Sequence, residues 1–304
     1  MPPPGLSPST ECLIPVVSLS ISGTFPKNPI AVTGQSVVFK VYSKLYRRDV
    51  AVKIVSQNAI PAAVAEKFLP RELDVTMKVR HPHIARCLAI TRPAPTKIVI
   101  ISDYYERGTL LDLILEQKRL KENPLAVTLF RQIIEAINYL HTRGITHRDV
   151  KLENILIDGN GDVKLIDFGF SRHVERRERS RSFCGTQPYT CPQMKKFRPY
   201  VPFCADFYAC GVVLFTMVVG KWPNLAVSTM NIFPDKYPSR ACRKLITALL
   251  DENESDRAGY DECVNSEWMG GHPAWMFANH AYFYEEVPTR AIDPDPWNFE
   301  MTEC

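Results

Sequence analysis

The sequence lacks a long hydrophobic run. Its longest apolar stretch, Ala209 to Val219, is shorter than the roughly 20 residues that a membrane-spanning helix needs. It also lies inside the chain, whereas a signal peptide stands at the start. We therefore expect neither a transmembrane helix nor a secretory leader.

The chain also lacks a strong excess of one charge. Its 37 Lys and Arg residues against 33 Asp and Glu give a formal net charge of +4, and the basic residues are dispersed rather than gathered in one stripe. Such a balance does not require a nucleic acid or a membrane surface as partner, and we expect neither.

Cysteine is present without the pattern of a disulfide framework. The nine cysteines are an odd number at irregular spacing, which indicates reduced thiols in an intracellular, cytoplasmic protein. His81, His83 and Cys87 are of metal-ligand type, but no second cluster completes a site, and we interpret them as structural.

The composition is otherwise that of a globular protein. With 304 residues, 45% hydrophobic and 23% charged, it excludes collagen, a coiled-coil rod and a disordered chain. At this length one hydrophobic core is near its practical limit, so we expect one two-lobed domain or two small domains.

Periodicity separates the chain into a strand-rich first half and a helix-rich second half. Asn123 is expected to cap a helix that has Pro124 in its first turn and ends at Gly144. The other expected elements are strands within 30–55 and at 97–102, 155–157 and 163–166, and helices at about 62–79, 210–219 and 243–250.

The residues that carry chemistry lie between the helix ending at Gly144 and a short strand. The segment His147-Arg148-Asp149-Val150-Lys151-Leu152-Glu153-Asn154 is followed, thirteen residues later, by Asp167-Phe168-Gly169. Transfer of a phosphoryl group from ATP needs a carboxylate that accepts the hydroxyl proton and oxygen ligands for Mg²⁺. Asp149 fits the first role, and Asn154 and Asp167 fit the second. A single acidic loop residue is usually only a solvated charge, but the ordered set argues against that interpretation.

With these motifs the sequence resembles the eukaryotic protein kinases over about residues 27–269. The resemblance implies an α+β, bilobal fold, with an antiparallel β-sheet lobe carrying one main helix (27–103) and a larger helical lobe (104–269). A Pro-rich tail (1–26) and an aromatic, acidic tail (270–304) would flank this domain.

The resemblance also implies a site for ATP and Mg²⁺ between the lobes. Lys53 would hold the α- and β-phosphates and pair with Glu72, and Asn154 and Asp167 would bind Mg²⁺. Ser102 would guard the pocket behind the adenine. The residues implied to contact ATP are Thr33, Gly34, Val41, Ala51, Lys53, Glu72, Asp103, Tyr105 and Leu156.

Further matches imply a serine/threonine kinase that acts on proteins. Lys151 is the residue usual at its position in that class, and Thr186 matches the hydroxyl that bridges the catalytic aspartate, Asp149, and this lysine. Asp206 matches the aspartate that braces the catalytic loop. The segments 66–72, 167–171 and 182–185 look like the testis-specific serine/threonine kinases of the calcium/calmodulin-dependent kinase group. Glu153 matches an acid that faces a substrate arginine, so substrates with upstream basic residues are expected. We favour a monomer.

The resemblance assigns regulation to the loop after Asp167. Ser182 matches an activating phosphorylation site, and Arg148 and Arg172 match the basic residues that bind its phosphate. Without phosphate, nothing is expected to neutralise these two arginines, and the remaining arginines of the loop are expected to be solvated.

The sequence departs from the family pattern at several positions. Ser36 and Phe39 stand where the second and third glycines of the phosphate-binding loop are usual, and Thr109 stands where many members carry an acid that contacts ribose. Gln193 replaces a glutamate that would pair with Arg257, so this anchor of the activation segment should be weaker.

Two other functions fit the same residues. A pseudokinase would keep the fold as a scaffold without turnover, which the altered glycine loop and Gln193 favour. A small-molecule kinase is weaker, because the segment around Thr186 resembles a platform for protein substrates. The retained set Lys53, Glu72, Asp149, Lys151, Asn154 and Asp167 favours an active serine/threonine protein kinase.

Overall fold

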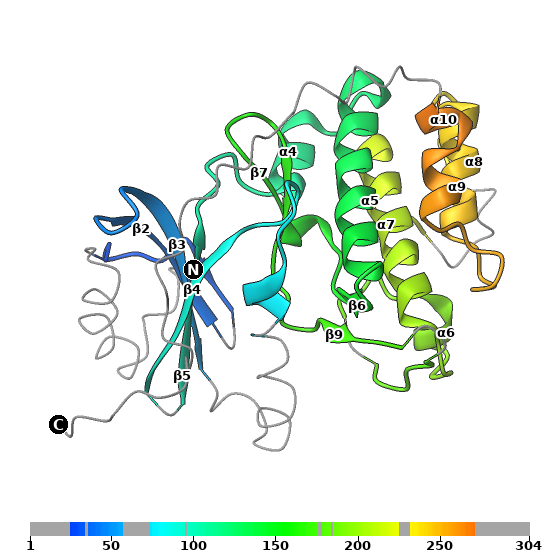
Figure 1. Ribbon diagram of the computed structural model, residues 1–304. Helices are drawn as coiled ribbons and strands as arrows, with labels where there is room; N and C mark the ends of the chain where they lie inside the picture. Colours follow the sequence, from blue (N-terminus) through cyan, green and yellow to red (C-terminus); the bar gives the residue numbers. More distant parts are fainter. Residues whose placement is uncertain are drawn as a thin grey trace.

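The computed structural model has two lobes, a twisted β-sheet lobe and a larger helical lobe (Figure 1). It describes residues 25–33, 36–56, 73, 75–94, 96–175, 178–183, 185–224 and 232–270. The expected α+β, bilobal fold is confirmed.

The smaller lobe is built on a five-stranded antiparallel sheet with the strand order β1-β2-β3-β5-β4. β-Branched residues dominate the central strands, as expected for a sheet with a buried face. That face is closed by a cluster that includes Phe39, Val52 and Ile101, and the ring of Phe25 packs edge-on against Phe39 at 5.1 Å. The strands are β1 (Ala31–Val32), β2 (Ser36–Ser43), β3 (Arg48–Ser56), β4 (Cys87–Ala94) and β5 (Lys97–Asp103).

The register of β2 against β3 corrects one sequence prediction. Lys53 pairs with Val38, and Val41 pairs with Val50. Paired residues of an antiparallel ladder lie on the same face, and successive residues alternate between faces. Val41 and Phe39 therefore lie on the face opposite to Lys53, where both are buried. The assignment of Val41 to the adenine site and of Phe39 to the phosphate loop is wrong, and Val38 is the strand residue on the Lys53 side.

The larger lobe is organised around α5 (Val127–His141) and α7 (Pro202–Val219), which run side by side through its core (Figure 1). Helices α8 (Arg240–Leu249), α9 (Tyr260–Val264) and α10 (Glu267–Gly270) lie together at the outer end. The remaining elements are α4 (Leu110–Gln117), η2 (Glu122–Ala126), β6 (Ile145–Thr146), η3 (Leu152–Asn154), β7 (Ile155–Ile157), β8 (Val163–Leu165), β9 (Arg172–His173) and α6 (Pro192–Lys195).

Helix α5 begins later than the sequence indicated. Asn123 has extended dihedral angles (φ −112°, ψ 133°) inside η2. The regular helix begins at Val127, and the residue at its N-cap position is Ala126, which offers no side-chain cap. The prediction that Asn123 caps the helix is therefore wrong.

Helix α7 is long and apolar enough to cross a membrane by length and composition alone. Of its 18 residues, however, 83% are buried inside the protein. Its side chains form the centre of the large-lobe core together with those of α5, and the helix also carries the buried Asp206. Buried core helices are apolar on all sides for this reason.

Candidate active site

One carboxylate on α7 holds the catalytic loop between β6 and η3. Asp206, on α7 and 1% exposed, accepts hydrogen bonds from the backbone N–H groups of His147 (2.9 Å) and Arg148 (2.8 Å). Its Oδ2 also lies 2.9 Å from Nε2 of His141 on α5. Burial alone would raise the pKa of Asp206, but the hydrogen bond and charge of His141, with the backbone donors, outweigh burial and lower that pKa.

The side chain of His147 connects the catalytic loop to the segment that carries Asp167. Its Nε2 lies 3.0 Å from the carbonyl oxygen of Ile166, and its Nδ1 accepts from the N–H of Asp149 at 3.3 Å. Since a carbonyl only accepts, Nε2 carries the proton and the ring is the neutral tautomer. The ring also packs edge-on against Phe168 at 5.2 Å. The two loops are therefore fixed relative to each other.

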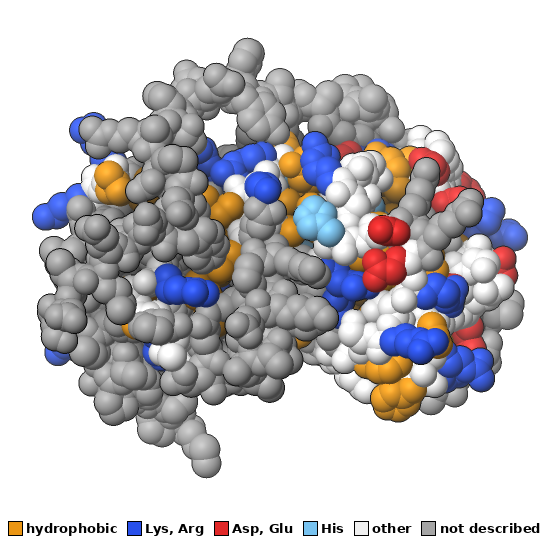
Figure 2. All heavy atoms as spheres, turned by 60° about the horizontal axis from the view of Figure 1, so that its bottom comes forward, with side chains coloured by type: hydrophobic (Ala, Val, Ile, Leu, Met, Phe, Trp, Pro, Cys, Tyr) orange, Lys and Arg blue, Asp and Glu red, His pale blue; other side chains and the backbone are white. Residues whose placement is uncertain are grey.

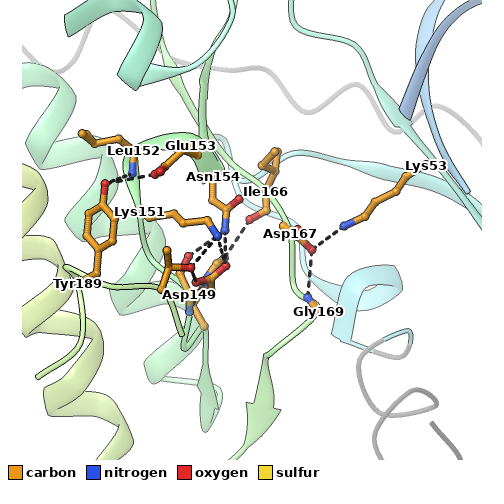
Figure 3. A network of polar contacts seen from close by, with 12 residues as sticks. Lys53, Asp149, Lys151, Leu152, Glu153, Asn154, Ile166, Asp167, Gly169 and Tyr189 are labelled. Carbon is orange, nitrogen blue, oxygen red and sulfur yellow. Dashed lines mark hydrogen bonds and ion pairs between the residues drawn. The ribbon is translucent and has the colours of Figure 1, made fainter. Parts of the chain in front are cut away.

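Three predicted residues, Thr186, Lys151 and Asn154, bond the carboxylate of Asp149; Figure 3 shows Lys151 and Asn154 beside it. Its Oδ1 accepts from the hydroxyl of Thr186 (2.9 Å), and its Oδ2 pairs with Nζ of Lys151 (2.7 Å). The same ammonium group donates to Thr186 Oγ1 at 3.0 Å. Nδ2 of Asn154 donates to Oδ2 (3.0 Å) and to the Asp149 carbonyl (2.9 Å). The expected bridging role of Thr186 between Asp149 and Lys151 is thus observed as geometry.

A second polar pair crosses from the sheet lobe to the helical lobe. Nζ of Lys53 on β3 lies 2.8 Å from Oδ1 of Asp167, which also accepts from the N–H of Gly169 at 3.3 Å (Figure 3). Burial would raise the pKa of Asp167, but the charge of Lys53 and its hydrogen bond outweigh burial and lower it. The predicted Lys53–Glu72 pair cannot be followed, because Glu72 lies outside the described residues.

The donor set of this cleft suits a hard divalent cation. Asn154 points its Nδ2 at Asp149, so its oxygen faces the other way (Figure 3). Asp167 takes both of its described donors on Oδ1, which leaves Oδ2 for a ligand. An amide oxygen and a carboxylate oxygen are the ligand types that Mg²⁺ prefers. The residues present fit the ion.

The strand that leads out of the sheet lobe, β5, carries Ser102 and Asp103, two residues predicted to lie at the ATP site. Ser102 on β5 pairs with Ala51 on β3, so both are neighbours at the back of the cleft. Asp103 forms an ion pair with Arg48 at 2.6 Å, and burial raises the pKa of Asp103. Tyr105 is half-buried, and the partial burial of its phenol raises its pKa as well.

Two further predicted ATP residues, Leu156 and Thr33, lie among the described residues. Leu156, half-buried on β7, forms an isolated bridge with Thr109, the residue that caps α4. Thr33 bonds Ser36 through its hydroxyl at 3.0 Å. Gly34 lies outside the described residues.

The activation segment contacts the catalytic loop at Ser182. A guanidinium nitrogen of Arg148 donates to Ser182 Oγ at 2.8 Å. Arg172, which was expected to lack a counter-ion, forms an ion pair with Glu178 at 2.5 Å. The expectation of two unneutralised arginines is therefore wrong for Arg172, because the loop supplies its own carboxylate six residues further on.

Comparison with known proteins agrees with this arrangement. The protein kinase domain family matches residues 33–269. The chain belongs to this family. It is 32% identical over 248 residues to testis-specific serine/threonine-protein kinase 1 of Mus musculus, covering 76% of this chain and 68% of the relative. It is 35% identical over 267 residues to NUAK family SNF1-like kinase 1 of Homo sapiens, covering 84% of this chain and 40% of the relative.

A plant relative shows the same level of similarity. CBL-interacting protein kinase 12 of Oryza sativa subsp. japonica is 32% identical over 253 residues, 78% of this chain and 46% of the relative. Together these relatives confirm the resemblance to serine/threonine kinases of the calcium/calmodulin-dependent group. They support ATP-dependent protein kinase activity.

The kinase anchors the end of its activation segment through Gln193 as well as by ionic contacts. Arg257 donates to Gln193 Oε1 at 3.2 Å, which shows that the two residues meet as predicted. Arg257 also donates to the carbonyls of Asp251 (2.9 and 3.0 Å) and Cys204 (3.1 Å). Gln193 Nε2 donates to the carbonyl of Glu252 at 2.6 Å. The contact between Gln193 and Arg257 is thus a hydrogen bond between a neutral and a charged group.

One exposed arginine of the kinase's activation loop, Arg179, has protein partners that were not expected. Arg179 forms an ion pair with Glu254 and donates to the carbonyl of Pro199 at 2.8 Å. Over the large lobe in Figure 2, basic side chains stand scattered among acidic, apolar and uncharged ones.

Several residues that the sequence analysis missed support the site. They are Val38, which faces the cleft, Glu178, which neutralises Arg172, His147, which joins the two loops, and Tyr189, whose hydroxyl accepts from Leu152 N and donates to Glu153. Glu175 and Glu178 stand among the arginines of this loop, but the sequence does not say which of them pairs with Arg172.

Replacement of Asp206 by Asn tests the role of the buried carboxylate. Asp206 is contacted by three groups, the backbone N–H groups of His147 and Arg148 and the imidazole of His141. An amide offers them only one acceptor oxygen, so buried donors lose their partner. We therefore expect the free energy of unfolding to fall by about 3 kcal/mol. Urea denaturation of Asp206→Asn at pH 7 measures it. Asp261→Asn, at an exposed position of α9, is the control and should change the free energy by less than about 0.5 kcal/mol.

The pH dependence of this difference follows from the sign of the pKa shift. Because the pKa of Asp206 is lowered in the folded protein, its stabilisation is complete above the unfolded pKa of about 3.9 and is lost as the pH falls below that value. The difference between wild type and Asp206→Asn should therefore shrink as the pH falls below about 4. A difference that grows on acidification would contradict this assignment.

Proposed function

We propose that this kinase transfers the γ-phosphoryl group of ATP to serine and threonine hydroxyls of protein substrates. The observation that carries the proposal is the assembled set of contacts in which Thr186 and Lys151 both bond the Asp149 carboxylate. A carboxylate in an ordinary solvated loop does not need a lysine, a threonine and an asparagine amide at hydrogen-bond distance. A carboxylate that accepts a proton beside a transferred phosphoryl group needs such neighbours, because they fix its position and offset negative charge.

The proposed reaction uses each of these groups once. Asp149 accepts the proton of the substrate hydroxyl while that oxygen forms a bond to the γ-phosphorus. The bond from the γ-phosphorus to the bridging oxygen breaks, and ADP leaves. Lys151, beside Asp149, offsets negative charge on the transferred group, and Lys53 orients the α- and β-phosphates.

Asn154 and Asp167 are the residues that would hold Mg²⁺. When bound, the ion supplies positive charge beside the phosphate oxygens and fixes their orientation. Lys53, which donates to Asp167 Oδ1, positions the carboxylate with its other oxygen toward the cleft. Thr186 and Lys151 do not depend on the ion for their contacts with Asp149.

A scaffold without turnover is the alternative that one observation favours. Ser36 occupies a glycine position, and its N–H and hydroxyl are both bonded to Thr33 Oγ1 at 3.0 Å. This local turn uses an N–H that a phosphate-binding loop would offer to ATP. ATP binding without phosphate transfer would support this alternative.

Replacement of Asp149 by Asn tests the enzyme proposal. The variant keeps the size and most hydrogen bonds of the side chain but cannot accept the proton, so kcat should fall by about 10²–10⁴-fold. Transfer of phosphate to a generic protein substrate measures the rate, and thermal unfolding shows whether the variant is folded. Equal rates in wild type and Asp149→Asn would exclude the proposed mechanism.

We propose a modest preference for basic residues before the acceptor hydroxyl. Glu153 is the supporting acid, but its Oε2 accepts from the Tyr189 hydroxyl at 3.2 Å, which leaves one oxygen for a substrate. Thr109 is uncharged and so supplies no second acid, and its hydroxyl is bonded to Asp112 in the cap of α4. Paired peptides with Arg or Ala upstream of serine should differ in KM by roughly threefold to tenfold, and Glu153→Gln should remove the difference. Equal KM values in the wild type would contradict the preference.

We further propose that phosphorylation of Ser182 activates the kinase. Ser182 is exposed and contacts Arg148, whereas the neighbouring Ser180 is 3% exposed. A phosphate carries a charge of about −1.5 to −2 and three acceptor oxygens, so it can bind both Arg148 and Arg172. At present Arg148 contacts the Ser182 hydroxyl and Arg172 contacts the Glu178 carboxylate. Phosphorylation would compete with Glu178 for Arg172.

Phosphosite mapping and the variants Ser182→Ala and Ser180→Ala test this regulation. Phosphate should appear on Ser182, and Ser182→Ala should lower kcat by roughly tenfold, since one or more charge-assisted hydrogen bonds are lost. Ser180→Ala is the neighbouring control and should keep its phosphate on Ser182. Full activity of Ser182→Ala without phosphate at that residue would show that no such switch exists.

An intracellular location completes the proposal. It is supported by the free thiols of the described cysteines, which are Cys87, Cys191, Cys204, Cys210, Cys242 and Cys263. Imaging of a tagged chain in cells checks it.

A further inference from the structure

Glu254, in the loop between α8 and α9, joins two segments of the large lobe. Its side chain is 10% exposed, and its Oε1 forms an ion pair with Arg179 of the activation segment. Its Oε2 accepts from the N–H of Val201, the residue before α7, at 3.0 Å. The guanidinium side of the pair is open to solvent, since the Arg179 side chain is 52% exposed. The pair differs from an ordinary surface salt bridge on the carboxylate side, where each oxygen has its own donor and the Glu254 side chain is shielded from water.

A series of contacts connects Arg179 to the catalytic loop. It also donates to the carbonyl of Pro199, and the next residue, Ser180, forms an antiparallel bridge with Tyr200 through two hydrogen bonds of 2.8 and 3.1 Å. The Tyr200 hydroxyl donates to the carbonyl of Ser182 at 2.8 Å. Ser182 in turn contacts Arg148, directly before Asp149.

The second anchor of the same segment carries less charge. Arg257 meets the neutral amide of Gln193 at 3.2 Å and is otherwise bonded to backbone carbonyls. This link therefore lacks the attraction of an ion pair. The one ionic contact from the loop between α8 and α9 to the described part of the segment before Thr186 is that of Glu254 with Arg179.

We propose that Arg179 and Glu254 are positioning residues that hold the activation segment with Thr186 against Asp149, in place of the ionic anchor that Gln193 cannot form. This inference rests on the proposed kinase function, and it extends that function to a pair of residues that touch neither ATP nor substrate. They act on turnover through the segment between them and Thr186.

The test uses Arg179→Gln, Glu254→Gln, the double variant and Arg179→Lys in the full chain. Each single neutral variant should lower kcat for a protein substrate by about tenfold and leave the KM for ATP unchanged. The double variant should be no slower than either single variant, because both remove the same contact. Arg179→Lys should recover most of the rate.

Hydrogen exchange of the segment from Glu178 to Thr190 gives a readout that needs no catalysis. Exchange there should be faster in Glu254→Gln and in Arg179→Gln than in the wild type. Lys196→Gln is the matched control, since Lys196 pairs with Glu252 of the same loop at 3.4 Å but both side chains are exposed (56% and 77%). It should change neither exchange nor rate.

The two readouts separate this inference from the proposed function. If the wild type transfers phosphate and the neutral variants keep its kcat, the positioning role is overturned and the kinase function stands. If the wild type transfers no phosphate, the function fails, and exchange alone decides whether the anchor exists. Unchanged exchange in both neutral variants, or an equal increase in Lys196→Gln, overturns the anchor.

Discussion

The buried carboxylate of Asp206 is the constraint on which the arrangement of the site depends. It gathers two consecutive backbone N–H groups of the catalytic loop and the imidazole of His141, so a loop and two core helices meet at one charge. Arg148 can then keep its left-handed φ of 67°, an unfavourable backbone geometry that persists only where the surroundings enforce it. Asp149 follows directly, and its position is therefore determined by the core of the lobe rather than by the loop itself.

Four ion pairs hold the side chains of the active site and of the activation segment. Lys151 pairs with Asp149, Lys53 with Asp167, Arg172 with Glu178 and Arg179 with Glu254. The first two pairs lie in the cleft, where substrate charges would compete for them. The last two lie in the activation segment, where a phosphate on Ser182 would compete for Arg172 but not for Arg179. Under the proposed regulation, the segment would combine one contact that a phosphate on Ser182 exchanges with one that it leaves in place.

The residues that the motifs assigned to catalysis and to Mg²⁺ lie close together in the structure, and their roles stay predictions. Asp149, Lys151, Asn154, Asp167 and Thr186 were assigned from motifs, and four of them meet at one carboxylate. The cleft face of β2 could not be derived in the same way. The run Val37-Val38-Phe39 is apolar at both parities, so alternation alone does not say which residues face Lys53, and the observed pairing with β3 decides it. The partners of Arg172 and Arg179 were equally out of reach, since they depend on how a loop folds back on itself and on the neighbouring loop.

The central claim is that this preassembled site transfers phosphate rather than merely binding nucleotide. The most direct measurement incubates the wild-type chain with Mg²⁺, a protein substrate and ATP that is labelled at either the γ- or the α-phosphate. The account predicts label on serine and threonine of the substrate from γ-labelled ATP and none from α-labelled ATP. ATP binding with no transfer of the γ-label would contradict it.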